Sequence, residues 1–166
     1  MVRTPKEGLW VQGARKFAVN GLPPLGCIPI GITKLPPNPE NTKPVKNSKC
    51  KCLEYVNDIS QEFNSLLQEK LQDLESILSE TKIAYIDFEE SLLDAIQNPN
   101  SYGFNEVNKG CCGTGLTEIG INRTGTTPIC VDASKYVFWD AAHPTEKTNE
   151  IIFTSNLPAI DDLIGN

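Results

Sequence analysis

The sequence has 166 residues, 39% of them apolar and 22% charged, which fits one folded domain and excludes wholesale disorder. Its net charge of −6 argues against a general nucleic-acid binder, because such proteins neutralise phosphates with Lys and Arg. No apolar run approaches the roughly 20 residues that cross a bilayer, and the first residues lack the apolar core of a secretory signal. The chain as written therefore predicts neither a transmembrane segment nor a signal peptide.

Residues 14–20 form a short, mostly apolar run that Gly21-Leu-Pro-Pro closes, which predicts a buried strand. Residues 31–49 are rich in Pro and Lys and predict a loop, because proline cannot supply the hydrogen bonds of a sheet. From about residue 53 to residue 79 apolar residues recur at steps of three and four, which predicts an amphipathic helix. The polar face of this helix is acidic, so core packing is favoured over membrane binding. Its predicted apolar stripe is Leu53, Val56, Ile59, Phe63, Leu67, Leu71, Leu74 and Leu78.

A second strand is predicted at residues 83–88, followed by a helix at 89–97 that Asn98-Pro99 stops. Residues 99–130 are rich in Gly, Asn and Thr and predict irregular structure. A third strand at 136–139 precedes a last helix that begins near Pro144 and runs to about Ser155. This alternation predicts an α/β fold with helices on both faces of a parallel sheet. Three strands are few for such a fold, so we expect the N-terminal part of a larger domain to be absent.

The cysteines indicate disulfides and an oxidising compartment, because they are even in number and frequent. Fifteen pairings are open, and zinc is disfavoured because the C-x-x-C spacing is missing and the single His is distant in sequence. The sequon Asn122-Arg-Thr agrees with secretion. The six cysteines are Cys27, Cys50, Cys52, Cys111, Cys112 and Cys130.

His143, the only histidine, follows the predicted strand 136–139, where open α/β sheets place their sites. Asp140 lies three residues earlier and can orient the imidazole for proton transfer. Two other interpretations stay open: the histidine is incidental, and Asp140 caps the helix that begins near Pro144. None of the nine serines lies in a Gly-x-Ser-x-Gly or Gly-Asp-Ser motif. Cys111 and Cys112 are interpreted as disulfide partners rather than as thiol nucleophiles.

Five ordered motifs together resemble the plant GDSL esterase/lipase family of SGNH hydrolases, from about Leu9 to residue 160. They are GARKF (13–17), GLPPLGC (21–27), YGF (102–104), CCGTG (111–115) and YVFWDAAHPTE (136–146).

The resemblance implies a flavodoxin-like three-layer SGNH hydrolase fold and a secreted enzyme that hydrolyses acyl esters, including lipids, without a metal or cofactor. Asp140 and His143 match the family's D-x-x-H motif, in which the histidine would be the catalytic base and the aspartate the residue that orients its imidazole. The family's Gly-Asp-Ser and Gly-x-Asn-Asp motifs, which supply the serine and an oxyanion donor, have no match here. The chain therefore resembles a single partial domain, the C-terminal part of a family member, with residues 1–8 unmatched.

Three hypotheses follow. The chain is part of a GDSL ester hydrolase and is inactive alone; or it is a non-catalytic relative that serves as a binding or interaction module; or it is a structural protein held by disulfides, in which His143 is incidental. Its expected partner is a small-molecule or lipid ester, and its substrate preference and oligomeric state stay open.

Overall fold

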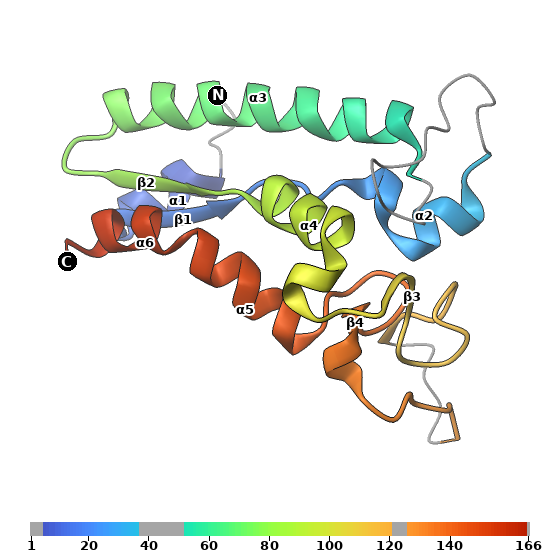
Figure 1. Ribbon diagram of the computed structural model, residues 1–166. Helices are drawn as coiled ribbons and strands as arrows, with labels where there is room; N and C mark the ends of the chain where they lie inside the picture. Colours follow the sequence, from blue (N-terminus) through green and yellow to red (C-terminus); the bar gives the residue numbers. More distant parts are fainter. Residues whose placement is uncertain (1–4, 37–51, 121–125, 166) are drawn as a thin grey trace.

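A computed structural model describes residues 5–36, 52–120 and 126–165, and Figure 1 shows their arrangement. Helices are interspersed with strands along the chain, as the sequence predicts for an α/β fold, although β3 and β4 follow each other without an α-helix between them. The predicted sequon at Asn122 and most of the predicted loop at 31–49 lie outside these residues. The elements are α1 (Pro5–Val11), β1 (Lys16–Asn20), α2 (Pro29–Lys34), α3 (Glu54–Ile77), β2 (Lys82–Ile86), α4 (Phe88–Gln97), β3 (Glu106–Gly110), β4 (Tyr136–Phe138), α5 (Glu146–Ser155) and α6 (Leu157–Ile164).

The three predicted strands are confirmed as β1, β2 and β4, and the three predicted helices as α3, α4 and α5. The prediction of irregular structure over 99–130 is wrong in part, because β3 lies there. This strand was missed because its sequence, Glu-Val-Asn-Lys-Gly, has one apolar residue and no alternation. The loop prediction for 31–49 is also wrong at its start, where α2 extends to Lys34.

The strands form two separate parallel pairs among the described residues, rather than one three-stranded sheet. β1 pairs with β2 in the register Phe17↔Ile83 and Val19↔Tyr85. β3 pairs with β4. As Figure 1 shows, α3 covers one face of the β1–β2 sheet, while α5 and α6 lie on the opposite face. Three layers are therefore present around this short sheet, which agrees with the predicted fold class.

The long helix α3 is rotated relative to the predicted stripe. Val56 and Leu71 are buried as expected, but Ile59 and Phe63 are exposed. Polar Asn57 and Asn64 are buried instead. Their side chains bind the segment after β1: Asn57 Oδ1 accepts from the Gly26 N–H at 2.8 Å, and Asn64 Oδ1 accepts from the Leu22 N–H at 2.7 Å. These bonds satisfy backbone donors that hydrophobic periodicity cannot reveal.

The larger buried cluster lies around α4 and the β3–β4 pair, at the end of the molecule that carries Asp140 and His143. It also contains the disulfide between Cys27 and Cys52, which ties the segment after β1 to the start of α3. A much smaller cluster joins β2 to α6. None of the helices in the described residues is long and apolar enough to span a bilayer. The larger cluster consists of Cys27, Ile28, Cys52, Leu92, Ala95, Ile96, Phe104, Val107, Val137 and Phe138.

Candidate active site

Asp140 lies in a tight turn that follows β4, and its side chain is only 1% exposed. The turn is closed by a hydrogen bond from the Trp139 N–H to the His143 carbonyl at 2.8 Å. Asp140 Oδ1 accepts from the backbone N–H groups of Ala142 at 2.9 Å and His143 at 2.8 Å. Its Oδ2 accepts from the Gly120 N–H at 3.1 Å. Three backbone donors therefore hold this buried carboxylate in place independently of the imidazole.

The imidazole of His143 lies against this carboxylate. Its Nδ1 is 2.9 Å from Asp140 Oδ2 and 3.0 Å from Oδ1. This contact favours the tautomer with a proton on Nδ1 and leaves Nε2 to accept a proton. The side chain of His143 is 62% exposed, so a group outside the described residues can approach it. The predicted pair is thus brought together in the geometry of a general base and the residue that orients it.

Asp140 does not cap the following helix, which was the alternative interpretation from the sequence. The cap of α5 is Thr145, whose hydroxyl accepts from the Thr148 N–H at 3.3 Å. The helix begins at Glu146, two residues later than predicted. Asp140 is therefore free to serve the turn and the imidazole.

Burial of Asp140 by itself raises the pKa of its carboxyl group, but hydrogen bonds outweigh it. The N–H groups of His143 and Ala142, with the imidazole, hold the pKa of Asp140 below its usual range. Folding thus favours the ionised form, so this stabilisation is fully present above the unfolded pKa of about 3.9 and is lost as the pH falls through the folded pKa.

We expect the free energy of unfolding of the wild type to fall more between pH 7 and about pH 3 than that of an Asp140→Asn variant, which has no carboxyl to protonate. Urea unfolding at the two pH values measures the free energy of unfolding of the wild type and of the variant. A difference between wild type and variant that does not change with pH contradicts this account of Asp140.

The loop between β3 and Gly120 supports the turn, and the sequence analysis did not identify it. Ala141 N–H donates to the Glu118 carbonyl at 2.9 Å, and the Cys112 N–H donates to the Trp139 carbonyl at 2.8 Å. A Cβ atom on Gly110 would lie 2.5 Å from the carbonyl of Asp140, so only glycine fits this approach. The only feature of the sequence that pointed to this supporting loop was the glycine-rich CCGTG motif (111–115).

Glu118 strengthens that loop from its exposed surface. The Thr114 hydroxyl donates to Glu118 Oε2 at 2.7 Å. Hydrogen bonds from the Thr114 side chain and from backbone N–H groups lower the pKa of Glu118 to about 2. Glu118 therefore stays ionised, and keeps its hydrogen bond to Thr114, at acidic pH values where an ordinary glutamate is protonated.

The disulfide prediction for the adjacent cysteines is right for one of them and wrong for the other. Cys111 is bonded to Cys130, whereas Cys112 is a free thiol that is completely buried. A completely buried thiol is out of reach of an ester, so Cys112 is not placed to serve as a nucleophile. The Cys111–Cys130 bond closes the loop that carries Gly120 and so constrains the donor to Asp140.

Six serines of the described residues use their hydroxyls in local hydrogen bonds, and none of these bonds is to the imidazole of His143. Each hydroxyl donates to an acceptor at most four residues away in sequence. These serines are Ser60, Ser65, Ser76, Ser91, Ser134 and Ser155.

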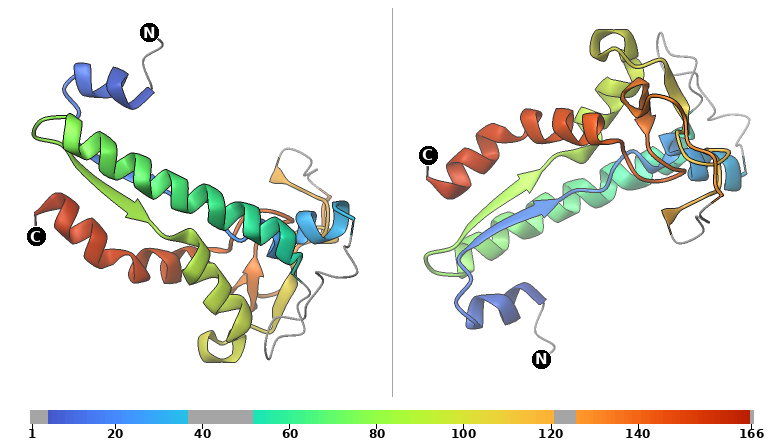
Figure 2. Two further views of the ribbon diagram at one scale, coloured as in Figure 1. Left: turned by 90° about the horizontal axis from the view of Figure 1, so that it is seen from above. Right: turned by 90° about the horizontal axis from the view of Figure 1, so that it is seen from below.

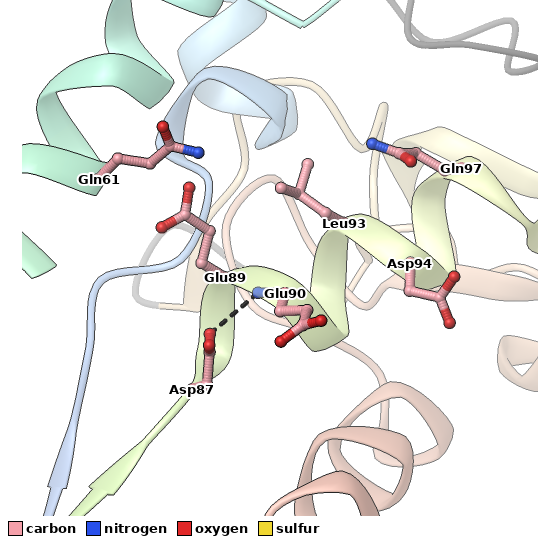
Figure 3. Close-up of a pocket in the computed structure, with 7 residues that line it drawn as sticks. All are labelled: Gln61, Asp87, Glu89, Glu90, Leu93, Asp94 and Gln97. Carbon is pink, nitrogen blue, oxygen red and sulfur yellow. Dashed lines mark hydrogen bonds between the residues drawn. The ribbon is translucent and has the colours of Figure 1, made fainter. Parts of the chain in front are cut away.

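A separate cavity of about 500 Å³ lies between α3 and α4, where Gln61 faces Asp87 and Glu89 (Figure 3). Its carboxylates act in the fold: Asp87 Oδ1 accepts from the Glu90 N–H at 2.9 Å and caps α4, and Asn64 Nδ2 donates to Glu89 Oε2 at 3.0 Å. Within residues 5–36, 52–120 and 126–165, no group of three His, Cys, Asp or Glu side chains is placed to hold a metal ion. Neither Asp140 nor His143 lines this cavity.

Comparison with known proteins decides the family. The model of the GDSL-like lipase/acylhydrolase family matches residues 2–155. The chain belongs to the GDSL-like lipase/acylhydrolase family. Three Arabidopsis thaliana relatives illustrate the match: GDSL esterase/lipase At5g45960 is 36% identical over 96% of this chain, EXL3 is 39% identical over 87%, and EXL2 is 40% identical over 92%.

These GDSL relatives are much longer than the region that they share with this chain. The alignments cover 41%, 37% and 38% of their lengths, in the same order. The chain thus spans about two fifths of the curated relatives that it matches.

Proposed function

We propose that this chain supplies the aspartate and histidine of a GDSL-type serine ester hydrolase, and that the serine and the oxyanion donors come from a segment outside it. The observation that carries the proposal is the contact of 2.9 Å between His143 Nδ1 and a buried Asp140 that three backbone donors hold. A fixed carboxylate behind an exposed imidazole is the arrangement that a nucleophilic hydroxyl needs.

In the proposed reaction, the serine oxygen attacks the ester carbonyl carbon while its proton passes to His143 Nε2. Asp140 stabilises the imidazolium that forms and keeps its orientation. Hydrogen-bond donors of the other segment hold the oxyanion. The tetrahedral intermediate collapses, the carbon–oxygen bond to the alcohol breaks, and the imidazolium returns the proton to the departing alcohol. Water then hydrolyses the acyl-serine with the same base.

The substrate class that we propose is an acyl ester, including lipid esters, because the relatives are named esterases/lipases. We propose that the protein is secreted. It is supported by the two disulfides, since such bonds persist in oxidising compartments and are rare in the cytosol.

The chain by itself is expected to show no serine-hydrolase activity. Loss of the triad serine costs about 10⁶-fold in a well-studied protease, and loss of an oxyanion donor about 10²–10³-fold, although the two effects are not additive. A fluorophosphonate probe applied to the purified chain is therefore expected to leave it unlabelled. Stoichiometric labelling that disappears in a His143→Ala variant would show that the nucleophile lies within this chain and overturn the proposed division.

A further inference from the structure

We propose that the open edge of β1 and one apolar flank of α3 form a docking surface for the part of a GDSL hydrolase that carries the serine. The inference rests on the proposed function, because that function requires such a part. It adds the place on this chain where the part binds and the secondary structure that it presents.

The first component is the edge of β1 that faces away from β2. The Gly21 N–H donates to the Ile86 carbonyl at 3.0 Å, and the Lys82 N–H donates to the Arg15 carbonyl at 2.8 Å. Backbone groups alternate in direction along a strand, so those of the even-numbered residues Lys16, Ala18 and Asn20 point away from β2. Among the described residues no strand pairs with this edge.

β1 is also less covered than a parallel strand usually is. Parallel strands are normally buried on both faces of a sheet. Here Lys16, Ala18 and Asn20 are exposed, whereas their partners in register on β2 include the buried Ala84 and Ile86. No residue of β1 belongs to either buried cluster. The helices on the two faces of the sheet therefore cover β2 more fully than β1.

The second component is the apolar flank of α3, formed by Ile59, Phe63 and Leu66, which are 62%, 46% and 53% exposed. It ends at the exposed ion pair between Lys70 and Asp73. At 100° per residue, the three apolar residues lie about 140–200° around the helix axis from Gln61. Gln61 faces α4 across the acidic cavity (Figure 3). The apolar flank therefore faces the other way, which is the β1 side of the sheet.

Figure 2 supports this placement. Seen from below, α3 lies beyond β1 on the side away from β2, so the helix overhangs the open edge. A strand added to β1 would lie beneath this overhang, and a helix that follows or precedes that strand would meet the apolar flank. The surface thus fits a parallel strand together with an amphipathic helix, which is the unit that extends an α/β sheet.

The occupant is a complementary part of a family member, because the relatives have well over half of their length outside the shared region. A second copy of this chain is the competing occupant. A two-fold dimer would place β1 against β1 in antiparallel pairing. It would therefore bury the edge without extending the parallel sheet.

The test is to co-express the full chain with the part of the EXL3 relative that it does not match, and to measure their stoichiometry and Kd. We expect a one-to-one complex. Phe63→Asp places a charge on the flank, and Ala18→Pro removes an N–H that points to the open edge while sparing the bonds to β2. Each is expected to raise Kd at least tenfold.

Two matched variants serve as controls. Phe153→Asp changes a phenylalanine of similar exposure, 54%, on α5, and Ala18→Thr keeps the edge N–H. Both are expected to stay within about threefold of the wild-type Kd, since Phe153 lies outside the proposed surface and Ala18→Thr leaves the backbone N–H that would pair with the added strand. Thermal melts of the four variants alone establish that each is folded.

The outcomes separate this inference from the proposed function. A complex that is sensitive to Ala18→Pro and Phe63→Asp but hydrolyses no p-nitrophenyl acetate contradicts the function and leaves the docking surface standing. A complex that hydrolyses this ester and is insensitive to both variants contradicts the docking surface alone. The absence of any complex, or a homodimer that the same variants dissociate, also overturns it.

Discussion

Replacing His143 by alanine is expected to lower kcat/KM for ester hydrolysis by about 10⁴–10⁶-fold in an enzyme that joins this chain to the serine-bearing part of a relative. The imidazole is the group that accepts the proton of the attacking hydroxyl, and its Nδ1 contact with Asp140 is made by no other side chain of the turn. Initial rates with p-nitrophenyl acetate measure the loss.

Asn149→Ala is the control for this experiment, because Asn149 is exposed on α5 and outside the proposed machinery. Its rate is expected to stay within about twofold of the parent, as most exposed substitutions change little. A His143→Ala enzyme that keeps a tenth or more of the parental activity would contradict the assignment of the base.

Replacing Asp140 by alanine is expected to lower the free energy of unfolding of this chain by about 2–4 kcal/mol. The change removes the charged acceptor of three part-buried backbone N–H groups, those of Gly120, Ala142 and His143, and a hydrogen bond to a charged group contributes about 1.5–3 kcal/mol. Water reaches the freed donors in part, so the total loss is smaller than the sum of three such bonds. His143→Ala is expected to change stability by no more than about 0.5 kcal/mol, because its exposed side chain packs against little.

Urea unfolding of the two variants tests this contrast. Asp140→Asn is a further control, because its amide oxygen keeps an acceptor for the N–H groups of Ala142 and His143. We expect its loss of stability to be smaller than that of Asp140→Ala. Equal stability of the Asp140→Ala and His143→Ala variants contradicts a structural role for the carboxylate.

Elements with strong local signals were predictable from the sequence. The steps of three and four apolar residues identified α3, and Asn98-Pro99 marked the end of α4 within one residue. β3 carries one apolar residue in five, so nothing local marked it. The orientation of α3 was also beyond local reasoning, because the hydrogen bonds of Asn57 and Asn64 to the segment after β1 form only in the folded chain.

The candidate site was predictable to the extent that side chains define it. A single histidine and a D-x-x-H spacing identified His143 and Asp140. The third donor to the carboxylate is the backbone N–H of Gly120, and a backbone group leaves no trace in residue type. The hydrogen bond between Ala141 and Glu118 could not be predicted for the same reason, because it joins the backbone N–H of one to the backbone carbonyl of the other.

The central claim is that this chain contributes the base and that another segment contributes the nucleophile. The most direct measurement is to label the joined enzyme with a fluorophosphonate and to identify the modified residue by mass spectrometry. We predict one modified serine, in the part contributed by the relative, and no modification when His143 is alanine. A modified residue within this chain, or labelling that does not depend on His143, would contradict the claim.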